Sequence, residues 1–187
     1  MEGLLSANCL SKASIFGGGG GNNIKSLQNG IAILNNSTAA HKDVIISSVD
    51  LSKSILVFNY KITGAYASTT MNTFLAGYFI NNQTICFSVN TYPGEPFTIA
   101  WTVVEFEKAN VQRGTAWLDR TNADVNVTIT PVNPNKSILL YSQYAFSSKG
   151  HIDEVPLYGK VNEDTITFAQ NRDDIYKRAH WQIIEFK

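Results

Sequence analysis

The sequence has few charged residues and no excess of either sign. Charged residues make up 16% of its 187 positions, and fifteen basic residues balance fifteen acidic ones. Globular proteins usually carry about a quarter charged residues. A nucleic-acid-binding surface needs a basic stripe, so no nucleic-acid partner is expected. Asparagine, threonine and serine replace the missing charges, and such a surface is typical of extracellular or virion β-proteins.

Cysteines and long apolar runs are also scarce. Cys9 and Cys86 lie far apart, and two such residues form neither a disulfide framework nor a metal site, so we expect free thiols. No stretch of about 18 apolar residues is present, so no membrane span is expected. The segment 1–16 opens with Glu2 and contains interspersed polar residues, unlike a secretory signal.

Motifs for catalysis are missing as well. His41, His151 and His180 show no metal-ligand spacing, and no Gly-x-Ser-x-Gly motif occurs. The polar cluster His151–Glu154 is either a solvated loop or a metal or glycan site. The sequence therefore predicts a non-enzymatic protein with no catalytic residues, metal ligands or cofactor.

A hexapeptide occurs twice in the chain. Trp101–Phe106 (WTVVEF) recurs at the C-terminus as Trp181–Phe186 (WQIIEF). Three further segments match in the same order: Lys25–Leu34 with Ala109–Leu118, Val49–Leu56 with Val132–Leu139, and Thr84–Phe87 with Thr165–Phe168. The offset falls from 84 to 80 residues along the chain, as expected if loops shortened while strands were kept. The chain therefore contains one domain twice.

Each copy has the composition of a β-domain. Short runs rich in valine, isoleucine, threonine and aromatic residues alternate with turn residues. In the first copy we expect strands at 24–34, 43–48, 55–62, 74–80, 84–90 and 98–107, and in the second at 111–118, 125–130, 138–144, 155–161, 165–170 and 178–186. This spacing predicts an all-β fold of two tandem antiparallel sandwiches, jelly-roll-like, at 24–107 and 108–187.

Alternation along the strands predicts the cores. Four aromatic side chains are expected to point inward: Trp101 and Phe87 in the first copy, Trp181 and Phe168 in the second. Cys86 is expected to point outward. The second copy has Thr167 at that position, so we interpret Cys86 as a small replaceable residue rather than a catalytic thiol.

A glutamate shares the tryptophan face in both copies and needs a partner, because burying an unpaired carboxylate is costly. One lysine also recurs in register. We therefore predict two ion pairs that fix strand register, Lys53 with Glu105 and Lys136 with Glu185.

Residues 1–23 form an arm outside the repeat. Its apolar residues and glycine run are Leu4, Leu5, Ile15, Phe16, Gly17, Gly18, Gly19, Gly20 and Gly21. Consecutive glycines normally form a flexible linker, so an ordered arm needs a partner to hold it, and we predict a docking segment. A phosphate-binding loop is excluded, since Ile24 rather than glycine precedes Lys25-Ser26.

Tyrosines at strand ends and loops are the remaining signal: Tyr60, Tyr66, Tyr78, Tyr92, Tyr144 and Tyr158. With nearby asparagine and serine they could line a sugar site or a protein interface. Alternatively, they cap the sandwich edges with amphipathic rings.

Several of these motifs are familiar together. The segments Gln112–Thr115, Val127–Leu139, Thr165–Phe168 and Trp181–Phe186 resemble small β-modules encoded by bacteriophages and prophages, often near tail genes. The order of Gln-x-Gly, two strands and a late tryptophan strand is also loosely similar to H-type lectins, six-stranded sugar-binding sandwiches that are usually trimers. The resemblance covers about residues 24–187 and leaves out the arm. Copy one departs from the pattern, because Asn29 replaces the arginine of Gln-Arg-Gly.

The resemblance implies a virion component at the tail, baseplate or capsid surface. One hypothesis is a structural or decorating module, expected to be a homo-oligomer, whose arm docks into another virion protein. The alternative is an adhesin that binds a host-surface glycan through loops such as Gly64–Asn72 or Ser147–Pro156.

Overall fold

The computed structural model describes residues 23–35, 40–62, 74–89, 96–119, 124–146, 157–170 and 176–187. The regular elements there are antiparallel strands and two short 3-10 turns, so the predicted all-β, sandwich-like fold is confirmed. The first copy contains β1 (Ile24–Leu34), β2 (His41–Ile45), η2 (Leu51–Lys53), β3 (Ser54–Ile62), β4 (Ala76–Asn81), β5 (Thr84–Ser88) and β6 (Phe97–Phe106). The second contains β7 (Ala109–Leu118), β8 (Asp124–Thr128), η3 (Pro134–Lys136), β9 (Ser137–Phe146), β10 (Leu157–Val161), β11 (Thr165–Gln170) and β12 (Tyr176–Phe186).

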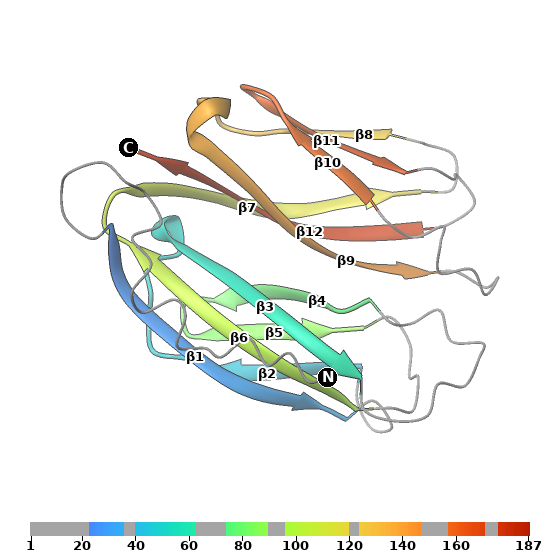
Figure 1. The fold of residues 1–187 in the computed structure, drawn as a ribbon. Helices are drawn as coiled ribbons and strands as arrows, with labels where there is room; N and C mark the ends of the chain where they lie inside the picture. The colour runs from blue at the N-terminus through green and yellow to red at the C-terminus, as the bar shows by residue number, and fades with distance from the viewer. Residues whose placement is uncertain are drawn as a thin grey trace, which may run out of the picture.

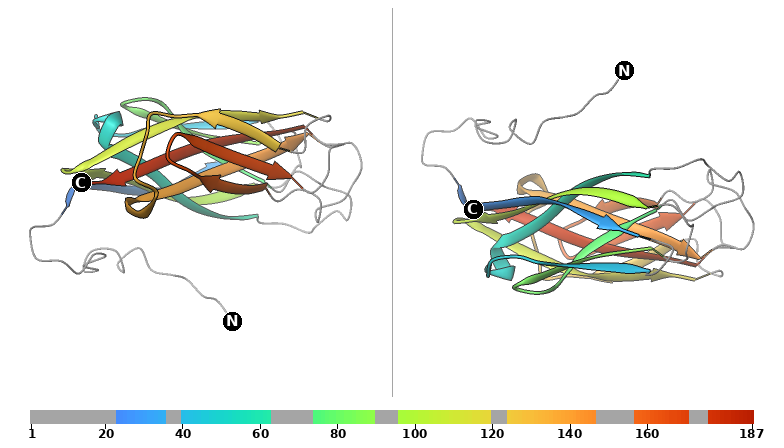
Figure 2. Two further views of the ribbon diagram at one scale, coloured as in Figure 1. Left: turned by 90° about the horizontal axis from the view of Figure 1, so that it is seen from above. Right: turned by 90° about the horizontal axis from the view of Figure 1, so that it is seen from below.

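The two copies share one topology. In the first, sheet β1-β6-β3 faces sheet β2-β5-β4, and in the second, sheet β7-β12-β9 faces sheet β8-β11-β10. The two sandwiches lie one above the other, with β7, β12 and β9 toward the first copy (Figure 1). The strands of both copies run along the same long direction of the molecule (Figure 2). In every sheet the strand that carries the repeated hydrophobic alternation is the central one: β6, β5, β12 or β11.

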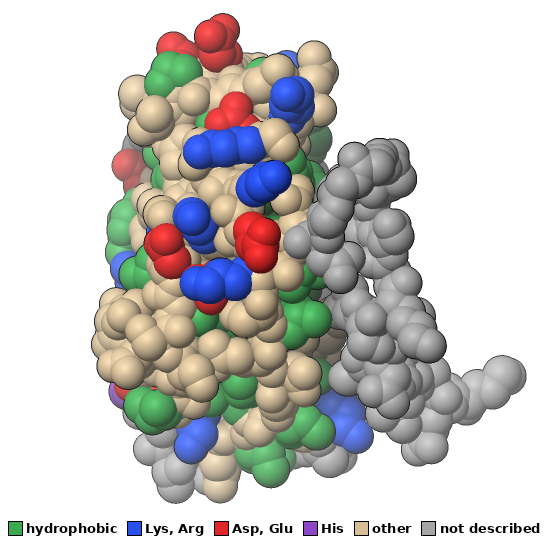
Figure 3. All heavy atoms as spheres, turned by 90° about the vertical axis from the view of Figure 1, so that its left-hand side faces the viewer, with side chains coloured by type: hydrophobic (Ala, Val, Ile, Leu, Met, Phe, Trp, Pro, Cys, Tyr) green, Lys and Arg blue, Asp and Glu red, His purple; other side chains and the backbone are tan. Residues whose placement is uncertain are grey.

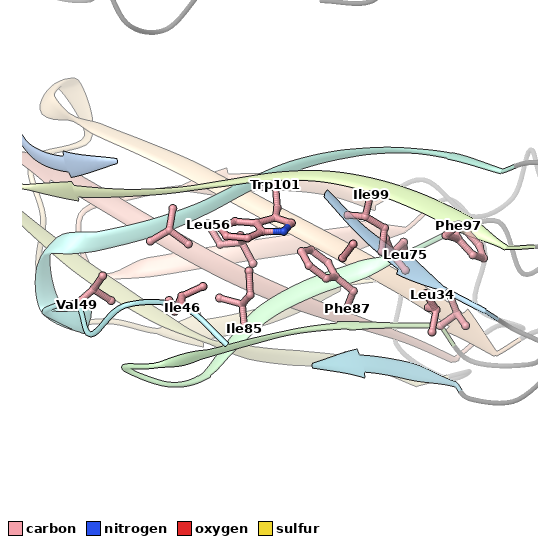
Figure 4. Packing of buried hydrophobic residues seen from close by; sticks show 13 residues of the cluster. Leu34, Ile46, Val49, Leu56, Leu75, Ile85, Phe87, Phe97, Ile99 and Trp101 are labelled. Atoms are coloured by element: carbon pink, nitrogen blue, oxygen red, sulfur yellow. The ribbon is translucent and has the colours of Figure 1, made fainter. Parts of the chain in front are cut away.

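Each sandwich has its own core. The aromatic residues predicted for these cores lie there: Phe87 and Phe168 are fully buried, and Trp101 and Trp181 are nearly so. Figure 4 shows Trp101 pointing from β6 toward the side chains of β5. Burying such rings removes about 150–250 Å² of each from water, which makes them the main stabilising residues of a small sandwich.

The repeated Gln-x-Gly motif has two structural roles. A Cβ on Gly30 would lie 2.6 Å from Cζ2 of Trp101, and one on Gly114 would lie 2.6 Å from Cζ2 of Trp181. Glycine therefore makes room for each core tryptophan. Gln28 bridges to the segment that follows β2, because its carboxamide accepts from Ser47 N at 2.7 Å and donates to Ser47 O at 3.0 Å.

In the second copy Gln112 binds both backbone groups of Thr130 in the same way, at 2.8 Å each. Both sandwiches therefore fix this segment with a neutral carboxamide.

The repeated glutamates bind the turns before β3 and β9, but through the backbone. Glu105 accepts from Asp50 N at 3.2 Å, and Glu185 accepts from Asn133 N at 2.8 Å. Asp50 and Asn133 in turn cap η2 and η3 with their side chains. The predicted ion pairs are therefore wrong. Each glutamate does bind the turn that carries the lysine, but it binds a backbone N–H there rather than the side chain of Lys53 or Lys136.

The glutamate of the first copy also forms an ion pair. Lys25 Nζ lies 2.9 Å from Glu105 Oε1, and Ser26 Oγ donates to the other oxygen at 3.0 Å. Burial raises the pKa of Glu105, but the hydrogen bonds from Lys25, Asp50 and Ser26 outweigh it and hold the pKa below its usual value. The second copy has Ala109 in place of Lys25. Charges of both signs gather on this end of the molecule (Figure 3), as expected of a solvated surface.

Candidate binding groove at the junction of the two sandwiches

The two sandwiches are joined by an apolar cluster of their own. It contains Ile55, Val104 and Phe106 from the first copy and Ala109, Val111 and Ile184 from the second, all buried. Phe106 and Phe186 meet edge to face at 5.6 Å between ring centroids. Because the cluster sits where β6 passes into β7, it fixes the turn between the copies.

Gln182 joins the copies by hydrogen bonds. Its side chain is 8% exposed and accepts from Leu56 N and donates to Leu56 O, at 2.9 Å each. Leu56 lies in β3, an edge strand, and these groups face away from β6. The carboxamide thus makes the two hydrogen bonds that a neighbouring strand would make, and satisfies backbone groups that would otherwise be buried without partners.

Ser142 does the same for β4, an edge strand of the other sheet in the first sandwich. Gly77 N in β4 donates to Ser142 Oγ at 3.0 Å, and that hydroxyl donates to Gly77 O at 3.2 Å. One face of sheet β7-β12-β9 therefore covers one edge strand of each sheet of the first sandwich, β3 and β4. Covered edges are protected from pairing with other chains.

Arg113 makes the third connection. Its guanidinium donates to the carbonyls of Leu51 and Ser54, the latter at 2.6 Å, and lies 5.0 Å from the ring centroid of Phe79. Burial lowers its pKa to about 10. At neutral pH the group stays charged, so it contributes charge-assisted hydrogen bonds, about twice as strong as neutral ones.

His180 packs against the first copy through its ring. It stacks on Tyr78 at 4.1 Å between centroids, with an interplanar angle of 7°. Burial, with a smaller contribution from the charge of Arg178, lowers the pKa of His180 to about 4. The imidazole is therefore neutral at pH 7 and acts in packing. Arg178 itself lies over the ring of Trp117 at 4.6 Å.

A groove of about 440 Å³ opens beside these contacts, between β3 and β9. Its lining comes from both copies: Leu56, Val57, Phe58, Tyr60, Phe74 and Leu75 from the first, and Leu140, Tyr141, Ser142, Gln143, Leu157 and Gln182 from the second. Four aromatic rings with hydroxyls and carboxamides beside them could bind a ligand with an apolar face and a polar edge.

Two polar groups of the groove are held in place by the backbone of Leu157. Tyr141 Oη donates to Leu157 O at 2.6 Å, and Leu157 N donates to Gln143 Oε1 at 3.2 Å. Tyr60, 37% exposed, lies on the opposite wall, and partial burial raises its pKa despite a hydrogen bond with the backbone of Leu75. The groove is therefore preformed, which lowers the entropic cost of binding.

A smaller cavity of about 220 Å³ lies at the same joint, lined in part by Gly77, Tyr78, Thr115 and His180. The basic side chains at its rim are Arg113 and Arg178, which pack on aromatic rings as described. This cavity therefore belongs to the joint between the sandwiches.

Cys86 is buried, not outward toward solvent as predicted. Its neighbours Ile85 and Phe87 do face the core, so the alternation is correct, but Tyr78 and Asp43 cover the outer side of β5 at this point. Burial raises the pKa of the thiol to about 11, which disfavours the reactive thiolate.

Other predictions fall outside the described residues. These are the arm (Leu4, Leu5, Ile15, Phe16 and Gly17 to Gly21), Cys9, the cluster 151–154, the loops 64–72 and 147–156, and the side chains of Tyr66, Tyr92 and Tyr144. Within the described part, Tyr60 lines the groove, Tyr78 belongs to the joint and Tyr158 is 65% exposed.

The sequence did not reveal the polar residues of the joint, because alignment of the copies emphasises what they share. Gln182, Ser142, Arg113 and His180 stand where the first copy has Thr102, Asn59, Asn29 and Ala100. All lie on the outer face of the second copy, opposite its core. Gln182, Arg113 and His180 are larger than their counterparts in the first copy and lie on an outward face, and this was the signal that could have located the joint.

Among the described residues, no group of three or more histidine, cysteine or acidic side chains is placed to hold a metal ion. Nor does that part of the chain contain a helix with the length and apolarity to cross a membrane. Comparisons with models of protein families, with curated proteins and with solved structures find no match for this chain.

Proposed function

We propose that the protein is a non-enzymatic structural component of a phage virion, in the tail, the baseplate or on the capsid surface. The observation that supports this best is the joint, where one sandwich covers one edge strand of each sheet of the other through Gln182 and Ser142. Such a joint holds two modules in one orientation, which suits a load-bearing or decorating part. The N-terminal arm 1–23 is then the anchor in a neighbouring virion protein.

Localisation tests this proposal. Purified particles are labelled with antibody against residues 24–187 and imaged by electron microscopy, and their protein content is measured by mass spectrometry. We expect a fixed number of copies per particle, and a chain lacking residues 1–23 should fold but fail to incorporate. Absence of the protein from washed particles contradicts the proposal.

The groove favours a second function, binding of a host-surface glycan. Tyr60, Phe74 and Tyr141 offer rings on which a sugar can stack, while Ser142 and Gln143 offer polar groups beside them. This is the combination used by many carbohydrate and loop-based protein sites.

A glycan-binding assay on residues 24–187 tests this second function. Phe74→Ala removes a ring of the groove, whereas Tyr158→Ala removes an exposed tyrosine elsewhere and serves as the control. Loss of binding with the first variant alone supports the groove. Binding that Phe74→Ala leaves unchanged, or no binding at all, contradicts it.

A further inference from the structure

The joint between the copies is one-sided. The second copy supplies a sheet face, and the first copy supplies two strand edges, β3 and β4. The capped groups are those of Leu56 and Gly77. The reciprocal contact, a face of the first copy on the edges of the second, is not made within the described part of the chain.

The second copy has the same two edges. Register against the central strands makes Leu139 the counterpart of Leu56, since they pair with Ile183 and Val103, and Gly159 the counterpart of Gly77. Alternate residues of an edge strand direct their backbone groups outward together. On β10 the outward backbone groups include those of Leu157, whose N–H and C=O bind the side chains of Gln143 and Tyr141. The next such position, Gly159, has no side-chain cap in the structure as described.

The first copy has the same face. Its outer residues on sheet β1-β6-β3 include Leu27, Asn29, Ile31, Val57 and Asn59. They correspond in order to Val111, Arg113, Thr115, Leu140 and Ser142, which lie at the joint in the second copy.

Apolar residues that are buried at the joint have apolar counterparts in the other copy that are exposed. Ile55 is 6% exposed in the joint, while its counterpart Ile138 is 41% exposed. Val111 is 8% exposed, while its counterpart Leu27 is 40% exposed. Ile31, at 74%, adds to the apolar face of the first copy. Each molecule therefore presents a second face and a second pair of edges that both carry exposed apolar residues: Leu27, Ile31 and Val57 on the face and Ile138 on the edge.

We propose that these two surfaces bind each other between molecules: the outer face of sheet β1-β6-β3 docks on the β9 and β10 edges of a second copy of this chain. Asn59 takes the place of Ser142 and binds the backbone of Gly159, and Thr102 takes the place of Gln182 opposite Leu139. Leu27, Ile31 and Val57 cover Ile138.

The contact is heterologous, because the two surfaces differ. Each molecule retains a free face at one end and free edges at the other after binding. Heterologous contacts either close into rings or extend as filaments, whereas a symmetric contact stops at a dimer. The proposal concerns self-assembly alone, so it stands or fails independently of virion location and of glycan binding.

Sedimentation velocity on the full chain and two variants tests it. Ile31→Lys blocks the face and Ile138→Lys blocks the edge, while Ile45→Lys, 78% exposed on β2 outside both surfaces, is the matched control. We expect wild type and Ile45→Lys to assemble with rising concentration and each blocked variant to be monomeric. An equal mixture of the two blocked variants should give dimers and nothing larger, because only one complementary pair of surfaces remains.

Other outcomes overturn the proposal. A wild-type chain that stays monomeric from micromolar to millimolar concentration shows that the surfaces do not bind. Blocked variants that still dimerise alone indicate a symmetric contact, and a mixture that stays monomeric shows that face and edge are not partners. Circular dichroism verifies folding, and Leu27→Asp with Ile138→Asp repeats the test with the opposite charge.

Discussion

The two copies have the same topology and nearly the same core, yet their outer faces differ. In the second copy Gln182, Ser142 and Arg113 bind the backbone of the first, whereas Thr102, Asn59 and Asn29 hold the equivalent positions on the other face. The cores could not diverge without cavities, but an outward face could gain a new contact by single substitutions. The comparison shows that the repeat preserves folding, while its exceptions create the joint.

Core truncation gives the largest expected effect and tests whether the copies unfold together. Phe87→Ala and Phe168→Ala each remove a fully buried ring, which should cost about 3–5 kcal/mol of unfolding free energy. Because the joint couples the sandwiches, we expect one thermal transition that shifts as a whole. Calorimetry measures this, and a variant with two separate transitions would show that the copies are independent.

Filling the space beneath the tryptophans should affect both copies equally. Gly30→Ala and Gly114→Ala each place a Cβ 2.6 Å from a tryptophan ring carbon. Overpacking of this kind costs about 1–3 kcal/mol. Urea denaturation measures the loss. A marked inequality between the two variants would mean that the cores relax differently despite their matching geometry.

Removal of the Gln182 side chain should destabilise the protein, whereas removal of its counterpart in the first copy should not. Gln182→Ala leaves the N–H and C=O of Leu56 without their partner, at a cost of about 1–3 kcal/mol. Thr102→Ala, at the equivalent position on the unused face, should change the stability of the monomer by less than about 0.5 kcal/mol. Equal losses from the two substitutions contradict the one-sided joint.

Acid should weaken the second copy through His180. Its pKa is about 4 in the folded protein against 6.5 when unfolded, so the unfolded state binds more protons between these values. Stability is therefore complete above pH 6.5, falls as the pH drops toward 4, and then levels off for this group. We expect about 1–2 kcal/mol of this loss to vanish in His180→Phe, measured by urea denaturation from pH 7 to 4. An unchanged pH profile rules out His180 as its cause.

The smallest effect is expected at Cys86 and concerns the reactivity of its thiol rather than the stability of the protein. In a Cys9→Ser background, alkylation at pH 8 should be far slower in the folded protein than in urea, because burial raises the thiol pKa to about 11. The counterpart variant Thr167→Cys is half-buried on β11 and should react faster. Equal rates would show that the cover over β5 opens readily.

Sequence alone predicted the fold well, because strands of a sandwich carry a period-two pattern that Ile85, Phe87, Ile166 and Phe168 display plainly. It predicted the wrong partner for Glu105, since a carboxylate can bind a backbone amide as well as a lysine, and no pattern marks an amide. The burial of Cys86 was missed for a related reason, because alternation gives the face of a residue and not what covers that face.

The groove could not be predicted at all. Its walls come from β3 and β9, whose approach depends on Gln182 and Ser142 binding edge strands far away in sequence. Glutamine and serine are common residues that mark no site in a sequence, and these two make their contacts only once both sandwiches are folded.

The connections that fix this molecule are mostly uncharged. Gln28 and Gln112 hold a segment within each sandwich, and Gln182 holds one sandwich to the other, each through a neutral carboxamide. Dissolved ions screen charges over roughly 10 Å at 0.1 M salt but leave such neutral bonds nearly untouched. We therefore expect the angle between the sandwiches to be the same in dilute water and in brine.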